Sequence, residues 1–170
     1  MTLGHDPSSP AVPILIADDY EEVRRGLRAI LAAEPSLRVV AEARDGREAL
    51  EMAKTHLPTV VLMDIGMPEM NGVEATRRIR QELPEIQVLI VSLHFSQELL
   101  KEAMEAGARG YLLKSDVESE LVSAIGSLIR REFYFSPKLH DLQAGPPALP
   151  RQTAAGGAST LALHLPRETK

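Results

Sequence analysis

Short runs of apolar residues alternate along the chain with longer stretches in which apolar positions recur every three or four residues. The short runs show no strict alternation of polar and apolar side chains, which is typical of strands buried on both faces of a parallel sheet. The sequence predicts five such strands, at residues 13–17, 37–43, 59–64, 87–92 and 110–114.

The longer stretches predict helices. In the first of them, Val23, Leu27, Ile30 and Leu31 have the spacing i, i+4, i+7 and i+8, which places them on one face. Five helices are expected, at residues 20–34, 46–56, 72–83, 96–107 and 115–131. Five strands that alternate with five helices predict an α/β fold, in which right-handed crossovers build a doubly wound five-stranded parallel sheet.

The two ends of the chain differ from this regular part. Residues 1–11 have the polar composition of an N-terminal leader, and residues 12–135 hold all the predicted elements of a single domain. Residues 136–170 are rich in Pro, Gly and Ala and show no sustained period. We therefore expect an irregular C-terminal tail there, either disordered or a truncated linker.

Composition excludes several classes of protein. A formal net charge of −5 argues against a general affinity for nucleic acid or membrane surfaces. The chain has no cysteine, so disulfides, thiol nucleophiles and thiolate metal sites are excluded. No apolar run approaches the ~18 residues that span a bilayer, and the N-terminus lacks the features of a secretory signal. We expect a cytoplasmic protein without membrane contact.

Polar side chains follow the predicted strands at the point where each strand ends. Asp18 and Asp19 follow the first strand, Asp64 ends the third, Ser92 the fourth and Lys114 the fifth. Ligands of doubly wound folds bind beyond the carboxyl ends of the strands, so we expect these side chains to lie close together. The sequence has none of the Gly-rich motifs that cradle phosphate in nucleotide-binding proteins of this class.

Three carboxylates at one sheet edge require positive charge nearby. Each pair repels by roughly 4 kcal/mol at 4 Å and an effective dielectric constant of about 20. Lys114 supplies one positive charge, and Mg²⁺, which binds carboxylates and water, can supply the rest. A carboxylate beside such a cation can attack phosphorus and form an aspartyl phosphate, while the Ser92 hydroxyl donates to a phosphate oxygen.

Four segments that carry these residues define a resemblance. In chain order they read "IADDY", "VVLMDIGMPEMNG", "IVS" and "GARGYLLKSD". Over roughly residues 12–135 the chain resembles the receiver domain of bacterial two-component response regulators, in the branch that usually carries a helix-turn-helix (LuxR-type) output domain. The resemblance implies a flavodoxin-like receiver fold and a signalling switch, not an enzyme. It also implies a cognate sensor histidine kinase as the partner that donates the phosphoryl group.

The resemblance also implies roles at the site. Asp64 would be the phosphoryl acceptor, and Lys114 would pair with Asp64 and its phosphate. Asp19 would bind Mg²⁺ directly and Asp18 mainly through water. Asp64 and the backbone carbonyl of Gly66 would be further ligands.

Further roles concern the response to phosphorylation. Ser92 would be the hydroxyl that closes on the phosphoryl group, and Tyr111 the aromatic side chain that swings inward with it. The surface that changes would be formed by the helix at 96–107, the strand at 110–114 and the helix at 115–131. Self-association is expected to use this surface.

Three alternatives stay open from the sequence. The chain could be the N-terminal part of a DNA-binding transcriptional regulator whose helix-turn-helix domain is missing. An aspartate-nucleophile phosphatase would need a second acid two residues after its nucleophile, where this chain has Gly66. A flavin-binding module would need a phosphate-binding loop after the first strand, where this chain has "DDYEE".

Overall fold

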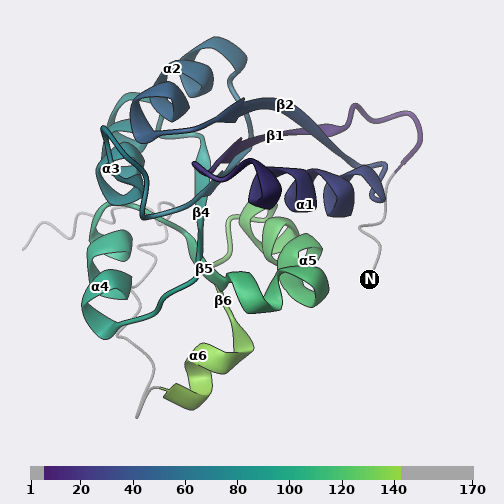
Figure 1. Cartoon of the computed structure of the whole chain (residues 1–170). Helices are drawn as coiled ribbons and strands as arrows, with labels where there is room; N and C mark the ends of the chain where they lie inside the picture. The colour runs from purple at the N-terminus through teal and green to yellow at the C-terminus, as the bar shows by residue number, and fades with distance from the viewer. Residues whose placement is uncertain (1–5, 143–170) are drawn as a thin grey trace, which may run out of the picture.

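The computed structural model describes residues 6–142. Within them, six parallel strands form one sheet in the order β2-β1-β3-β4-β5-β6 (Figure 1). The strands are β1 (Val12–Ala17), β2 (Leu37–Ala43), β3 (Val60–Met63), β4 (Gln87–Ser92), β5 (Gly110–Leu113) and β6 (Tyr134–Phe135). The helices are α1 (Glu21–Ala32), α2 (Gly46–His56), α3 (Gly72–Glu82), α4 (Gln97–Glu105), α5 (Val117–Ile129) and α6 (Pro137–Leu142), with a 3₁₀ turn η1 (Lys114–Asp116) before α5.

Helices cover both faces of the sheet, which explains why its strands are apolar at successive positions. In β1, Leu15 and Ala17 join a core cluster with α2, α3 and α4, whereas Ile14 and Ile16 join a second cluster with α1 and α5. Successive strand side chains point to opposite faces, so both sets must be apolar when both faces are buried. The doubly wound α/β architecture predicted from the sequence is confirmed.

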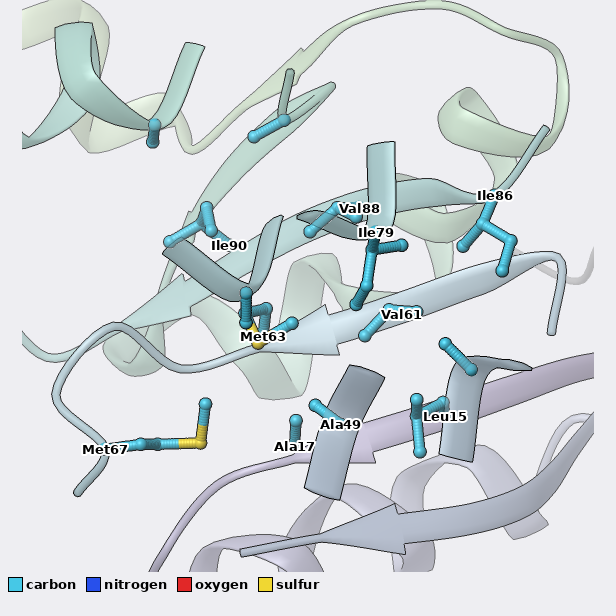
Figure 2. Packing of buried hydrophobic residues seen from close by; sticks show 14 of the residues in the cluster. Leu15, Ala17, Ala49, Val61, Met63, Met67, Ile79, Ile86, Val88 and Ile90 are labelled. Carbon is cyan, nitrogen blue, oxygen red and sulfur yellow. The ribbon is translucent and has the colours of Figure 1, made fainter. Parts of the chain in front are cut away.

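The first cluster shows how the strands and helices interlock. Figure 2 shows Val61 of β3 and Val88 of β4 beside Ile79 of α3, and all three side chains are fully buried. Met63, the last residue of β3, belongs to the same cluster. The central strand is therefore held rigidly up to the residue that precedes Asp64.

Side-chain caps begin the three helices on this face. Asp45, Asn71 and Ser96 each accept a hydrogen bond from the backbone N–H three residues further on, at 2.8, 2.9 and 3.0 Å respectively. Such caps satisfy N–H groups that have no partner inside the helix. At the other end of α4, Gly107 has φ +103°, as expected for the glycine that closes this helix.

The predicted count of five strands and five helices was wrong, because the described residues contain six of each. The sixth strand, β6, has two residues and pairs with β5, and α6 follows it within the stretch expected to be irregular from residue 136. Leu139 of α6 is buried in the first cluster. A strand of two residues is too short to show a hydrophobic period in the sequence. It forms because its backbone pairs with the edge of β5. The rest of the predicted tail, residues 143–170, lies outside the described residues.

Strand register brings the carboxyl ends to one edge. Ala17 pairs with Met63, and Ser92 pairs with Leu113. Asp18, Asp64 and Lys114 each follow one of these paired residues directly. Between residues 6 and 142, none of the helices combines the length and apolar character that a bilayer crossing requires.

Candidate functional site

Three aspartates meet beyond the carboxyl ends of β1 and β3. One oxygen atom from each of Asp18, Asp19 and Asp64 can be chosen such that all three lie within 4.8 Å of one another. Asp18 and Asp64 are buried. The sequence placed these acids at one edge, and the structure brings them together there.

Lys114 reaches the two buried acids from the end of β5. Its Nζ lies 2.7 Å from Oδ2 of Asp18 and 3.3 Å from Oδ1 of Asp64, and its side chain is only 9% exposed. Burial alone would lower the pKa of the Lys114 ammonium. The hydrogen bond to Asp18 and the charge of Asp64 outweigh burial and raise the pKa above its ordinary value. Lys114 is therefore a cation, and it balances one of the three negative charges.

The surroundings of Asp64 disfavour the ionised form of its carboxyl, because its pKa lies above the ordinary value. Burial raises the pKa of its carboxyl, the neighbouring Asp18 raises it further, and Lys114 offsets part of this shift. A carboxylate held in this way gains from any additional positive charge. The site is therefore electrostatically incomplete with Lys114 alone.

The donor set fits a hard divalent cation. Oδ1 of Asp19 is buried and has no hydrogen-bond partner within the described part of the chain. A buried carboxylate oxygen without a partner is costly, and coordination of a cation would satisfy it. Oxygen ligands of this kind are those that Mg²⁺ prefers. Gly66, the proposed backbone ligand, is exposed in the loop two residues beyond Asp64.

Ser92 and Tyr111 lie on the neighbouring strands and share one loop residue. The Ser92 hydroxyl accepts a hydrogen bond from the backbone N–H of His94 at 3.2 Å. The Tyr111 hydroxyl donates to the backbone carbonyl of His94 at 2.6 Å, and its ring packs edge-on against Phe95. Tyr111 is fully buried, and this burial raises the pKa of its phenol. The aromatic side chain is thus already directed inward.

Gly72 allows the start of α3 to lie against the loop that follows Asp64. Its N–H donates to the carbonyl of Ile65 at 2.9 Å, and a Cβ atom on Gly72 would lie 1.9 Å from the carbonyl oxygen of Asp64. Only glycine permits this approach, because the atom in the way belongs to the backbone. Gly72 therefore helps to fix the position from which the Asp64 side chain projects.

We expect Gly72→Ala to lower the free energy of unfolding by about 3 kcal/mol, the upper end of the range for overpacking, because backbone must move to relieve the clash. Gly66→Ala is the matched control in the same loop, since no atom lies within 4 Å of the added Cβ. Its effect should stay within about 0.5 kcal/mol. Urea denaturation of the two variants measures both values, and equal stabilities would contradict the close approach.

Sequence reasoning missed Arg24. This residue of α1 is buried, with Leu27 and Leu31 on the same face of the helix. Its Nη1 donates to the backbone carbonyl of Asp18 at 2.7 Å. The signal was present in the spacing, because positions 24, 27 and 31 form one helical stripe in which an arginine replaces an apolar residue.

Comparison with known proteins assigns the family. Residues 14–126 match the response regulator receiver domain, and the chain belongs to this family. The transcriptional regulatory protein DegU of Brevibacillus brevis is 40% identical over 132 residues, which cover 77% of this chain and 56% of DegU. The response regulator UvrY of Escherichia coli (strain K12) is 35% identical over 148 residues, covering 87% of this chain and 68% of UvrY.

Solved structures agree with this assignment. The crystal structure of a two-component response regulator of the LuxR family from Aurantimonas sp. SI85-9A1 matches with a TM-score of 0.74 at 36% identity. The match covers 78% of this chain and 94% of that one. Residues 14–126 are thus a receiver domain of the two-component response regulators. The chain spans a little over half the length of curated relatives such as DegU.

Proposed function

We propose that this receiver is switched by phosphorylation of Asp64. The observation that carries the proposal is the cluster of Asp18, Asp19 and Asp64. Lys114 pairs with the first and the last of these acids, and Oδ1 of Asp19 has no hydrogen-bond partner among the described residues. A carboxylate oxygen of Asp64 attacks phosphorus. A bond forms between this oxygen and phosphorus as the bond from phosphorus to the donor's histidine nitrogen breaks. A sensor histidine kinase is the proposed donor.

The residues around Asp64 would bind the metal ion and pair with the transferred phosphoryl group. Mg²⁺ would be held by the three carboxylates of Asp18, Asp19 and Asp64 and by the backbone carbonyl of Gly66. The bound ion supplies positive charge to the transferred phosphoryl group. Lys114 pairs with Asp64 before transfer and with a phosphate oxygen after it.

Ser92 and Tyr111 would transmit the change. An aspartyl phosphate adds further negative charge and acceptor oxygens to the site, as phosphorylation does on other side chains. When Ser92 turns to donate to a phosphate oxygen, its acceptance from the His94 N–H is lost or redirected. The Tyr111 hydroxyl is hydrogen-bonded to the carbonyl of the same His94. Movement of the loop that carries His94 would therefore also displace the Tyr111 hydroxyl.

The energy required decides whether Ser92 can act alone. To shift the ratio of active to inactive conformations from 1:99 to 99:1, phosphorylation must stabilise the active conformation by about 5.5 kcal/mol relative to the inactive one. One hydrogen bond to a charged group contributes about 1.5–3 kcal/mol. Lys114 must therefore stabilise the phosphorylated state as well, or the switch is partial.

The output would use protein contacts on α4, β5 and α5, including self-association. The outer edge of β5 is already paired with β6, so these contacts would come mainly from the two helices. In this proposal the chain is a cytoplasmic switch without an enzymatic output of its own. Nucleic-acid binding is not part of its function.

A second candidate is supported by the names and lengths of the relatives. DegU is named a transcriptional regulatory protein, and the match covers 56% of it. This receiver would then control a helix-turn-helix domain. Sequencing the gene beyond the codon for Lys170 tests this candidate, because a reading frame that continues into such a domain is required.

One experiment tests the leading proposal. The protein is incubated with acetyl phosphate and Mg²⁺, the modified residue is located by mass spectrometry, and amide shifts are recorded with beryllofluoride. We expect one phosphoryl group on Asp64, loss of labelling after chelation of the metal, and shifted amides in the β4–α4 loop, α4 and β5. Labelling that persists without metal, or amides that stay unchanged across residues 92–113, would contradict the proposal.

A further inference from the structure

The side chain of Arg24 connects α1 to the end of β1. It is only 8% exposed, and its three nitrogen atoms face three different groups. Nη1 donates to the backbone carbonyl of Asp18 at 2.7 Å, Nε donates to Glu42 at 3.1 Å, and Nη2 pairs with Glu21. A planar guanidinium with a fixed fork of donors suits this arrangement, whereas an ammonium group does not.

The carbonyl that Arg24 holds belongs to the peptide unit between Asp18 and Asp19. A peptide unit is planar, so holding the Asp18 oxygen also fixes the orientation of the Asp19 nitrogen. The other side of Asp18 is fixed by the sheet, because its N–H donates to the Ala43 carbonyl at 3.0 Å. Arg24 therefore restrains the peptide unit from which Asp19 continues the main chain.

Asp19 is also the member of the acid cluster that lacks an anchor of its own. Asp18 accepts from the N–H of Tyr20 at 2.9 Å and pairs with Lys114, and Asp64 pairs with Lys114 as well. Oδ1 of Asp19 has no hydrogen-bond partner in the described structure. The orientation of its carboxylate thus depends on the main chain that carries it.

We propose that Arg24 is a positioning residue of the cation site, which holds the Asp18 carbonyl so that Asp19 presents its free oxygen to the metal. The inference rests on the proposed function, since it requires that the acid cluster binds Mg²⁺. Residues that orient metal ligands in this way typically change metal affinity by 10- to 100-fold when they are replaced.

A purely electrostatic role would have the opposite sign. The Arg24 guanidinium is positive, so its removal would by charge alone make Mg²⁺ bind more tightly. Loss of positioning makes Mg²⁺ bind more weakly. A merely structural role would lower the melting temperature and leave the affinity of the folded protein unchanged.

Arg28 offers a matched control on the next turn of α1. It shares both carboxylate partners of Arg24, with Nη1 2.5 Å from Glu42 and Nη2 3.6 Å from Glu21. Its described contacts do not include the Asp18 carbonyl. A comparison of the two arginines therefore separates the carbonyl contact from the ion-pair network.

The experiment is a Mg²⁺ titration followed by amide NMR at constant ionic strength, with the wild type, Arg24→Met, Arg24→Lys and Arg28→Met. We expect Arg24→Met to raise the dissociation constant for Mg²⁺ about tenfold. Arg24→Lys should raise it in the same direction, because lysine keeps the charge without the fork. Arg28→Met should stay within about twofold. Without Mg²⁺, the Asp19 amide nitrogen should shift in the two Arg24 variants and not in Arg28→Met.

An unchanged or lower dissociation constant in the Arg24 variants, with normal binding by the wild type, overturns this inference alone. Absence of Mg²⁺ binding by the wild type overturns the proposed function and the inference with it. If Arg24→Met does not fold, Arg24→Lys decides, since a wild-type affinity in that variant contradicts the need for the fork.

Discussion

Replacement of Asp64 by asparagine should abolish phosphorylation by acetyl phosphate, with a loss of labelling of roughly 100-fold or more. The amide has the shape of the carboxylate but cannot act as the nucleophile. The substitution should not lower the free energy of unfolding. Burial and Asp18 raise the pKa of Asp64, so its charged form is disfavoured in the folded state. Above that raised pKa the charge costs stability, and the neutral asparagine removes this cost.

The control for this variant lies in the same loop. Glu69 is an exposed carboxylate five residues beyond Asp64, and Glu69→Gln removes its charge with as little change of shape. The Glu69→Gln variant should be phosphorylated by acetyl phosphate as fast as the wild type. Mass spectrometry of the labelled protein and urea denaturation without Mg²⁺ give the two readouts. Labelling of Asp64→Asn at the wild-type rate would place the acceptor elsewhere.

Replacement of Lys114 by methionine should cost about 3–5 kcal/mol of stability in the absence of metal, the range for removing one partner of a buried ion pair. Methionine keeps most of the apolar stem, so the loss reports on the charge. Asp18 and Asp64 then lose the ammonium group with which both of them pair. Mg²⁺ bound at the proposed site would stabilise the folded state alone, so its addition should recover part of this loss.

An exposed lysine provides the comparison. Lys54 pairs with Glu82 at 2.7 Å, but both side chains are more than 40% exposed. Lys54→Met should therefore cost much less stability than Lys114→Met, because solvent screens the exposed pair. Urea denaturation measures the loss of unfolding free energy for the two variants, each with and without Mg²⁺. Similar losses for the two lysines would mean that burial of the Lys114 pairs contributes nothing.

The predictable part of the fold is the part with a strong local period. Strand β3 is entirely apolar, and β1 and β4 are largely apolar. The helices between them carry apolar residues at helical spacing, so both kinds of element and their alternation follow from the sequence. Alternation then requires parallel strands, and parallel strands place their carboxyl ends at one edge. The gathering of Asp18, Asp64 and Lys114 follows from these rules without knowledge of any distance.

Other features depend on contacts between segments distant in the sequence. Strand β6 exists because the edge of β5 offers backbone partners: Tyr134 N–H donates to the Arg109 carbonyl and Ser136 N–H to that of Tyr111, at 3.1 and 3.0 Å. The two hydrogen bonds of His94 join Ser92 to Tyr111 across two strands.

The chain by itself determined the order of its elements and the acids that end its strands, because hydrophobic periods and strand ends are local properties. Only the tertiary structure decided which carbonyl Arg24 holds and that Oδ1 of Asp19 has no hydrogen-bond partner among residues 6–142. Both depend on how α1 and β2 pack around the end of β1. Side-chain hydrogen bonds need atoms placed to within a few tenths of an ångström, and in this protein packing against distant segments sets these positions.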